Sequence, residues 1–374
     1  MPFARVESVE LGSCSPGNEE EENKFREVKM SGKNVQKKER RKKAGVINRR
    51  TAVWAIVMVL ASGFSNFPLA WGKDYPNKPI QMITPYGPGG ESDLAARALA
   101  SVVPEYLGQP LIVINRGGAG GALACSAVAQ AKADGYTLLL ARTGSNAIFP
   151  ALNPKAPFQY DAFTPMALLQ VDPNVMAVRA DSPYKTIQDL IQGLRAKPGQ
   201  LRYSTSGPGT VLNLGVQITF KEAGLPKTSA TMIPFDSGGK AVTALLGGHV
   251  DFLFVNTPPV IGHVMAGKLR ALAVTTPQRL KDFPDVPTFA EVGFPKVDLV
   301  GWSAIFGPKN LPGEVMEKWE QALQKVFKNP SWLAMVENQH SVPTYLNPKG
   351  MKEYLDQEYQ RYYVLGRELD ILIK

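Results

Sequence analysis

Short apolar runs alternate with helix-like segments from Tyr75 to the end of the chain. Runs of this length that are rich in Val, Ile and Leu predict buried β-strands. Strands that alternate with helices are typical of a parallel sheet with helices on both faces, so the pattern predicts an α/β fold. The predicted strands are Ile80–Thr84, Leu111–Asn115, Tyr136–Ala141, Val175–Arg179, Leu201–Thr205, Ala230–Phe235, Val250–Val255, Leu269–Thr275 and Val300–Phe306.

The segments between these runs carry signals for helix starts. Asp93 precedes the segment Leu94–Ala100, and both Thr186–Asp189 and Thr288–Glu291 have the form of a capping box. In a capping box the first side chain satisfies free N–H groups at the start of a helix. The last ~60 residues, Pro312–Leu372, are predicted to be purely helical and to pack over a sheet.

Residues 1–72 have a different pattern and are predicted to be a leader. A basic run, Lys37–Lys43, and then Arg49-Arg50 precede the apolar stretch Thr51–Ala61, and small residues follow it. Basic, then apolar, then small is the pattern of a secretory signal. The apolar stretch is shorter than the ~20 residues of a membrane span, although an uncleaved anchor remains the alternative. The acidic stretch before Met30 indicates an over-extended gene start, and the arginine pair leaves twin-arginine export open beside the general route.

The formal net charge of +9 is divided between the leader and the rest. Residues 1–72 carry 13 Lys and Arg against 8 Asp and Glu, which leaves only +4 for the remainder. This small charge suits an anionic ligand and argues against nucleic acid, which needs many phosphate contacts. After the leader Cys125 is the only cysteine, so the mature chain is expected to form no internal disulfide.

Four of the predicted strands run into loops of small residues that open a helix. The loops are Ile83–Asp93, Ile114–Gly121, Tyr203–Thr210 and Ile233–Gly239. In an open α/β sheet the carboxyl ends of the strands form the ligand crevice, and helix N-termini there favour an anion. Glycine and proline are also common in plain turns. Four such loops, rich in Ser and Thr, nevertheless favour a shared anion site.

Motifs of enzyme chemistry are missing from the sequence. The segment Gly87–Ser92 is close to a dinucleotide fingerprint but lacks its third glycine and a following acidic partner. There is no phosphate-binding loop and no nucleophile elbow, and the three histidines lack metal-ligand spacing. We therefore expect no catalytic group, no metal and no organic cofactor. An enzyme would need Asp93, Asp236 and His249 to face one another.

Ordered motifs cover the chain from Tyr75 to its end. They are Tyr75–Ile80, Pro85–Asp93, Asn115–Gly121, Asp134–Leu138, Leu245–Asp251, Gly267–Val274 and Asp285–Thr288. Together they resemble the periplasmic receptors of tripartite tricarboxylate transporters, the Bug or extracytoplasmic solute receptor family. The resemblance implies an α/β, two-domain periplasmic-binding-protein fold of the Venus flytrap, type II-like kind, with a ligand cleft between the domains. Domain 1 would comprise 75–175 plus 298–374, and domain 2 would comprise 176–297.

The resemblance also implies that loops after strands hold a carboxylate, often through ordered water. Backbone donors and water bind a carboxylate without a titrating partner. The candidate ligand-binding residues are Tyr86, Gly87, Pro88, Gly89, Gly90, Ser92, Asp93, Arg142, Thr143, Gly144, Ser145, Asn146, Ser204, Ser206, Gly207, Thr210, Phe235, Asp236, Ser237, Gly238 and Asn256.

Departures from the family pattern bear on the ligand. Phe235 and Asp236 stand where the family commonly has Tyr and a basic residue, and Val255 stands where it often has an acid. If Asp236 faces the cleft it would disfavour a second carboxylate and favour an amino group; if it faces solvent it changes only surface charge. Arg142 either pairs bidentately with a carboxylate or is a plain surface arginine.

The sequence therefore predicts an exported, periplasmic solute-binding protein, monomeric and not an enzyme. It would capture a small carboxylate-containing metabolite or amino acid for the membrane subunits of a tripartite tricarboxylate-type transporter. Mono- and dicarboxylates, aromatic acids and amino acids remain open as ligands. The alternatives are a receptor that feeds a membrane sensor kinase and an enzyme built on the same fold.

Overall fold

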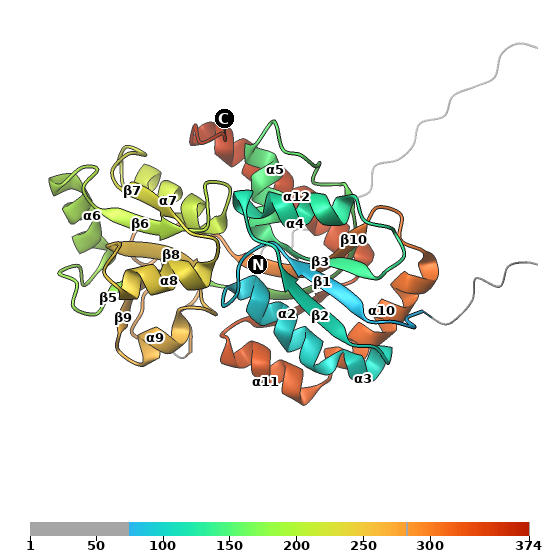
Figure 1. The fold of residues 1–374 in the computed structure, drawn as a ribbon. Coiled ribbons are helices and arrows are strands. Elements are labelled where there is room, and N and C mark those ends of the chain that lie inside the picture. The colour runs from blue at the N-terminus through green and yellow to red at the C-terminus, as the bar shows by residue number, and fades with distance from the viewer. Residues whose placement is uncertain (1–74, 282, 374) are drawn as a thin grey trace, which may run out of the picture. The chain divides into compact units, whose positions relative to one another are not determined.

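The computed structural model describes residues 75–281 and 283–373, which form two mixed β-sheets covered by helices (Figure 1). The predicted leader, 1–72, lies outside the described residues. Within the described ranges, no helix is long and apolar enough to cross a membrane.

The first lobe is built on a six-stranded sheet with the order β11-β4-β10-β3-β1-β2. Strands β1, β2 and β3 are parallel, whereas β10 and β11 pair antiparallel with their neighbours. The strands are β1 (Ile80–Thr84), β2 (Leu111–Asn115), β3 (Thr137–Arg142), β4 (Phe163–Asp172), β10 (Gly301–Pro308) and β11 (Val342–Leu346).

Helices cover both faces of this sheet because its central strands are apolar on both sides. In β3, Leu138 and Leu140 pack with one group of helices, and Leu139 and Ala141 pack with the other. The first group comprises α2 (Glu91–Val102), α3 (Pro104–Leu107), α10 (Gly313–Val326) and α11 (Pro330–Asn338). The second comprises α4 (Ala122–Ala129), α5 (Phe149–Leu152) and α12 (Pro348–Glu368), with the short turns η1 (Ala119–Gly121) and η2 (Thr143–Ile148).

The second lobe is built on a five-stranded sheet with the order β7-β6-β8-β5-β9. The strands are β5 (Asn174–Arg179), β6 (Arg202–Thr205), β7 (Thr231–Pro234), β8 (Phe252–Asn256) and β9 (Leu269–Val274). Its helices are α6 (Ile187–Ala196), α7 (Val211–Glu222), α8 (Gly238–Leu246) and α9 (Ile261–Met265). Helices α6 and α7 pack on the face of the sheet that carries Tyr203, Phe252 and Phe254. Helix α8 packs on the opposite face, which carries Val175, Leu253 and Val255.

The sheets are mixed, so the expectation of a parallel sheet holds for β1, β2 and β3 in the first lobe and for β6, β7 and β8 in the second, and not for the other strands. Strand β4 of the first lobe continues through Pro173 into β5 of the second lobe, and β10 carries the chain back. Each crossing strand enters its sheet from the edge where the parallel strands end. Asn174 opens β5 opposite Asn256, the last residue of β8. A strand that enters at that edge must run antiparallel to the strands that finish there.

Each predicted strand forms, with ends shifted by no more than two residues. The capping box at Thr186–Asp189 is confirmed at the start of α6. At Thr288 and Glu291 both capping bonds form, at 2.7 and 3.1 Å, but only turns follow. Gly293, with a φ of +91°, and the following Pro295 end the segment before a helix can form.

Two further predictions are corrected. Helix α2 begins at Glu91, so Asp93 lies in its first turn instead of before it. The C-terminal region is not purely helical, because Val342–Leu346 forms the edge strand β11. Its Pro343 is tolerated there because an edge strand leaves one side of its backbone unpaired.

Candidate functional site

The carboxyl ends of the parallel strands in both sheets meet at the crossing segments. Gly301 opens β10 opposite Asp172 at the end of β4, as Asn174 opens β5 opposite Asn256. Side chains tie the crossings together: Asn256 Nδ2 donates to Asn174 Oδ1 at 2.7 Å, and Asn174 Nδ2 donates to Leu299 O at 2.7 Å. Loops from both lobes therefore converge on one place.

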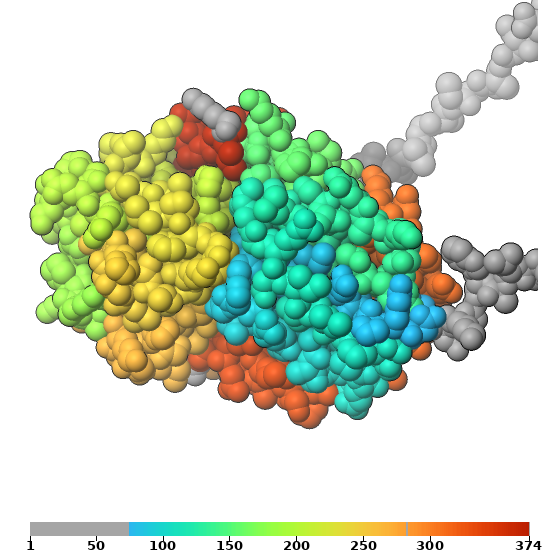
Figure 2. All heavy atoms as spheres, viewed as in Figure 1, coloured from blue at the N-terminus to red at the C-terminus, as the bar shows by residue number. Residues whose placement is uncertain are grey.

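Two of the predicted small-residue loops, Ile83–Asp93 and Ile233–Gly239, lie directly against each other. The backbone N–H of Gly87 donates to the carbonyl oxygen of Asp236 at 2.9 Å. A Cβ atom at Gly239 would lie 2.4 Å from the carbonyl oxygen of Gly89, a contact that no side chain permits. In Figure 2 the yellow atoms of the second lobe accordingly abut the blue and teal atoms of the first lobe. The lobes are closed in this structure.

A small cavity lies where the lobes meet. It has about 10 Å³ of room for the centre of a water molecule, which is about the space that one water needs. Its lining residues come from both lobes, and they are Tyr86, Glu91, Arg142, Thr143, Gly144, Ser206, Thr210, Val211, Leu212 and Asn256.

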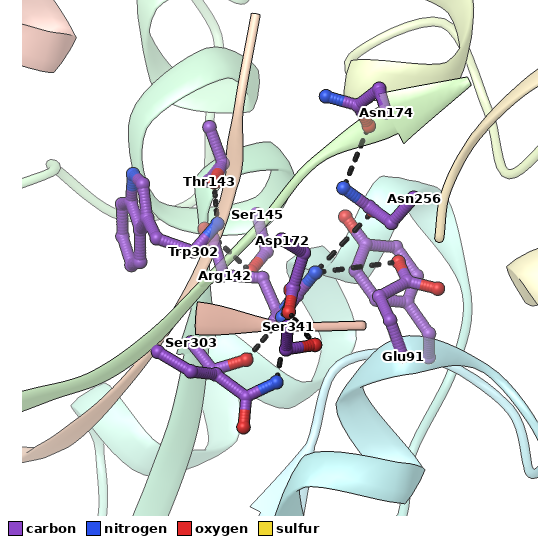
Figure 3. A network of polar contacts seen from close by, with 12 residues as sticks. Glu91, Arg142, Thr143, Ser145, Asp172, Asn174, Asn256, Trp302, Ser303 and Ser341 are labelled. Atoms are coloured by element: carbon purple, nitrogen blue, oxygen red, sulfur yellow. Dashed lines mark hydrogen bonds and ion pairs between the residues drawn. The ribbon is translucent and has the colours of Figure 1, made fainter. Parts of the chain in front are cut away.

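Arg142, the last residue of β3, is the charged centre of the site (Figure 3). Its side chain is buried, so its reading as a plain surface arginine was wrong. The Nη1 atom lies 2.6 Å from Asp172 Oδ2 and also donates to the hydroxyl of Ser303. The Nη2 atom has only longer contacts, at 3.4 Å to Asn256 Oδ1 and 3.9 Å to Glu91 Oε1. One side of the guanidinium is therefore held firmly, and the other lies beside the cavity.

Asp172, which the sequence did not single out, is the counter-ion that holds Arg142. It is fully buried at the end of β4. Its Oδ1 atom accepts hydrogen bonds from Gln170 Nε2 at 2.8 Å and Ser341 Oγ at 2.7 Å. With both carboxylate oxygens engaged, Asp172 positions the arginine and has little capacity left for a ligand.

Glu91 also lines the cavity, although the sequence analysis did not include it among the candidate ligand-binding residues. It opens α2 inside a predicted ligand loop, is 3% exposed, and has no hydrogen-bond partner for Oε2 anywhere in the described part of the chain. Burial raises the pKa of its carboxyl group, and the charge of Arg142 opposes that shift. Oε2 points toward the start of α8, since a Cβ at Gly238 would lie 2.6 Å from it. An acid in the first turn of a helix is ordinary in a sequence, so nothing there signalled its burial.

The second lobe contributes neutral groups. Thr210 Oγ1 donates to the carbonyl oxygen of Gly207 at 2.7 Å, which fixes the loop before α7. Ser206 Oγ is buried and has no partner among residues 75–281 and 283–373. Val211 and Leu212 open α7, and the first N–H groups of a helix have no partner within it. Ser206, Val211 and Leu212 line the same cavity as Arg142.

Several predicted residues fix the end of β3 and the turn that follows it. Asn146 Oδ1 accepts from the backbone N–H of Arg142 at 3.2 Å and from Ser145 Oγ at 2.7 Å. Thr143 Oγ1 accepts from the backbone N–H of Trp302 at 2.7 Å. A Cβ at Gly144 would lie 2.6 Å from the Tyr86 hydroxyl, so glycine there lets the ring approach. These contacts set the end of β3 and the turn that follows it.

The remaining predictions lie near the cavity without lining it. Asp93 accepts from the N–H of Gly89 at 3.0 Å and pairs with Arg97 at 2.9 Å. The Asp236 side chain is 43% exposed and lies 2.7 Å from Lys240 Nζ. The candidates outside the lining are Gly87, Pro88, Gly89, Gly90, Ser92, Asp93, Ser145, Asn146, Ser204, Gly207, Phe235, Asp236, Ser237 and Gly238.

The three groups that an enzyme would have needed are not brought together. Asp93 and Asp236 have the partners just described, and His249 is exposed before the opposite end of β8. No group of three or more His, Cys, Asp or Glu that could hold a metal occurs in the portion of the chain described here.

Comparison with known proteins places the chain in a family. Residues 95–371 match the family described as "Tripartite tricarboxylate transporter family receptor". The chain belongs to this family. It is 32% identical to Protein BugT of Bordetella pertussis over 302 residues, which covers 80% of this chain and 92% of BugT. The resemblance seen in the sequence is thereby confirmed.

Solved structures confirm the two-domain fold of this receptor. It is similar to the periplasmic binding protein BugD, with a TM-score of 0.76 and 26% identity over 80% of this chain and 100% of BugD. It is also similar to MatC of Rhodopseudomonas palustris with bound malate, with a TM-score of 0.74 and 26% identity over 78% of this chain and 99% of MatC.

Proposed function

We propose that this receptor captures a small carboxylate-containing metabolite in the cavity between its lobes and delivers it to the membrane subunits of a tripartite tricarboxylate-type transporter. The observation that carries the proposal is the buried Arg142, which lines a small cavity between the lobes. The binding of malate by the similar protein MatC supports a carboxylate as the ligand class.

The donors around the cavity suit a carboxylate. Arg142 Nη2 offers a charged donor, Ser206 Oγ offers a hydroxyl, and the start of α7 offers backbone N–H groups and the positive end of a helix dipole. A carboxylate that binds these groups would satisfy donors from both lobes at once. The cavity as it is closed here has room for about one water, so a bound ligand would hold the lobes further apart than they lie in this structure.

Capture would proceed by closure of the lobes. A ligand shifts a conformational equilibrium only when it binds one state better than the other. Arg142 belongs to the first lobe and Ser206 to the second, so only the closed form offers both to one ligand. The contact between the loops at Gly87 and Asp236 would then hold the closed form in place.

We further propose that the protein acts in the periplasm as a monomer after export, without a cofactor and without enzymatic activity. The lobe boundaries that we propose are 75–175 plus 298–374 for domain 1 and 176–297 for domain 2. Strand β4 of the first lobe ends at Asp172 and β5 of the second begins at Asn174, close to the first boundary. Strand β10, which returns to the first lobe, begins at Gly301, close to the second.

A thermal-shift screen against mono-, di- and tricarboxylates, aromatic acids and amino acids tests the proposal. A ligand at 100 times its Kd should stabilise the protein by about 2.7 kcal/mol, and calorimetry would confirm each hit. Arg142→Lys keeps a positive charge for Asp172 but removes the second nitrogen, so it should abolish the shift. The exposed Arg179→Lys is the matched control and should retain it. If no compound of these classes binds the wild-type protein, carboxylate capture is not its role.

A further inference from the structure

A short segment near the end of the chain lies against both lobes. This C-terminal tail, Leu369–Ile373, follows helix α12 of the first lobe. The N–H of Ile371 donates to the carbonyl oxygen of Gly366 in α12 at 3.0 Å. The N–H of Ile373 donates to the carbonyl oxygen of Leu152 in α5 at 2.8 Å. The backbone of the tail is therefore anchored in the first lobe.

Two lysines of the second lobe bind the tail and the end of α12. Lys227, in the loop between α7 and β7, donates from Nζ to the carbonyl oxygen of Asp370 at 2.8 Å and to Asp370 Oδ2 at 2.6 Å. Lys221 in α7 donates from Nζ to the carbonyl oxygen of Glu368, the last residue of α12, at 3.1 Å. The last carbonyl groups of a helix have no partner within it and carry a partial negative charge. The second lobe therefore places two cations at the negative end of a helix of the first lobe, where red and yellow-green atoms adjoin in Figure 2.

The backbone at Asp370 has a conformation that glycine adopts more easily. Its φ is +50°, and its N–H donates to the carbonyl oxygen of Arg367 at 3.1 Å. This is the position just after a helix where glycine is the usual residue. Aspartate tolerates a positive φ better than most residues but not as well as glycine. The residue that stands in this turn thus supplies the carboxylate that Lys227 binds.

Helix α7 connects the tail to the cavity between the lobes. Val211 at the start of α7 lines the cavity, and Lys221 lies near the other end of the helix. Just before α7, a Cβ atom at Gly209 would lie 3.0 Å from Ile373 Cδ1. The tail and the end of α12 therefore contact the second lobe near both ends of α7. A motion that opened the cavity by moving α7 away would have to break these contacts.

We propose that the C-terminal tail is a clasp that holds the lobes together in the absence of a ligand. It acts from outside the cavity, since none of its residues lines the cavity, and it is independent of which ligand binds there. Its ion pair is open to solvent, with the Asp370 side chain 89% exposed, so salt should weaken the clasp. A receptor whose lobes are already together binds more tightly any ligand that needs them together.

The distance between the lobes of the full-length, ligand-free protein tests the clasp. Spin labels on Lys132→Cys in the first lobe and Lys185→Cys in the second, both exposed positions, report this distance by double electron–electron resonance. Cys14 and Cys125 are replaced by alanine to keep the labelling specific. In the Lys221→Met/Lys227→Met double variant, the ratio of closed to open molecules should fall about 2- to 5-fold, the size expected of exposed ion pairs. Raising sodium chloride from about 0.05 M to about 0.5 M should lower this ratio in the labelled parent protein and have little effect in the double variant.

Three further variants separate a clasp from a purely local role of the tail. Lys352→Met is the matched control, because Lys352 Nζ lies 2.7 Å from Asp356 Oδ2 within α12 and does not touch the second lobe. It should leave the ratio unchanged. Lys227→Arg keeps the charge and should retain most of the closed molecules. Asp370→Gly removes the carboxylate but suits the positive φ, so the turn should persist while the ratio falls.

Equal ratios in the double variant and the labelled parent protein would overturn the clasp. A parent protein without a closed population, or an equal loss of closed molecules in Lys352→Met, would also overturn it. A ratio in Asp370→Gly that matches the parent protein would show that the carboxylate does not hold the lobes. The measurement uses no ligand, so its failure leaves carboxylate capture standing. A thermal-shift screen without hits would in turn leave the clasp standing.

Discussion

The two lobes contribute different chemistry to the same cavity. The first lobe supplies the charged side chains of Arg142 and Glu91, with Asp172 behind them. The second lobe supplies only neutral groups, including the hydroxyls of Ser206 and Thr210. If the cavity holds the ligand that we propose, the first lobe recognises its charge, and the second lobe completes the site through hydroxyl and backbone groups when it closes.

The difference follows from what each lobe can stabilise before a ligand arrives. Buried charges need partners, and in the first lobe the ends of β3 and β4 place Arg142 against Asp172. In the second lobe the loop before α7 satisfies most of its own polar atoms, as Thr210 does with Gly207. We infer that the first lobe holds a preformed charged surface against which the second lobe closes.

The largest effect is expected from removing the charge at the centre of the first lobe. Arg142→Met leaves the buried carboxylates of Asp172 and Glu91 without their guanidinium. Breaking a buried ion pair by removing one partner costs about 3–5 kcal/mol, measured as a loss of unfolding free energy in urea. Arg179→Met removes an arginine from a partly exposed pair with Asp181, and such pairs contribute about 0–1 kcal/mol. Equal losses in the two variants would show that the Arg142 cluster is not a buried ionic centre.

The second largest effect is expected where the lobes touch. Gly239→Ala would place a Cβ 2.4 Å from the carbonyl oxygen of Gly89, so the loops could not close as they do here. Overpacking costs about 1–3 kcal/mol, and a penalty on the closed form alone weakens ligand affinity by roughly 5- to 150-fold. Calorimetry measures the affinity, and small-angle scattering measures the closure.

The control for this variant is Gly262→Ala in helix α9, where an added Cβ meets no atom within 4 Å. It should bind ligand as the wild-type protein does. Unchanged affinity in Gly239→Ala would mean that the ligand-bound form does not need the loop contact seen here.

A third prediction concerns the pH dependence that Glu91 gives the first lobe. Burial raises the pKa of this carboxyl group in the folded protein. As pH rises through the unfolded-state pKa, the unfolded chain therefore loses its proton before the folded protein does, and stability falls. Relative to Glu91→Gln, the ligand-free wild-type protein should become less stable as the pH rises from below to above about 4.3, the ordinary pKa of a glutamate. Urea unfolding across this range measures the difference, and parallel curves for the two proteins would contradict it.

Nine strands of this fold could be predicted because apolar runs mark them directly. The two strands that the sequence analysis missed, β4 and β11, contain proline. Strand β4 includes Pro165, which pairs at an irregularity in the register with β10, and β11 includes Pro343 at the sheet edge. Bulges and edges are the positions at which a sheet accepts proline. Such positions exist only once neighbouring strands are placed, so local pattern could not reveal them.

The site could be located from the sequence only in part. Glycine loops after strands indicated where the lobes meet, and Tyr86, Arg142 and Ser206 do line one cavity. The burial of Glu91 depends on α8 of the other lobe, which no local signal near Glu91 reports. Asp236 departs from the family pattern, yet it lies at the surface beside Lys240.

The smallest effect is expected from the second lobe, where two serines allow a matched test. Ser206 lines the cavity, and its buried hydroxyl has no partner within the described chain, whereas the hydroxyl of Ser204 donates to the carbonyl oxygen of Ala241 at 3.0 Å. Ser206→Ala removes no bond from the ligand-free protein, so its unfolding free energy should not fall. Its ligand affinity should drop by about 2- to 10-fold, the effect of one neutral hydrogen bond.

Ser204→Ala should do the reverse, with a loss of about 0.5–1.5 kcal/mol in unfolding free energy and little change in affinity. Urea unfolding and calorimetry on the same two variants would separate the roles. If Ser206→Ala lowers stability and leaves affinity unchanged, its hydroxyl serves the fold. The second lobe would then act on the ligand through backbone groups alone. Only the first lobe would contact the ligand through side chains.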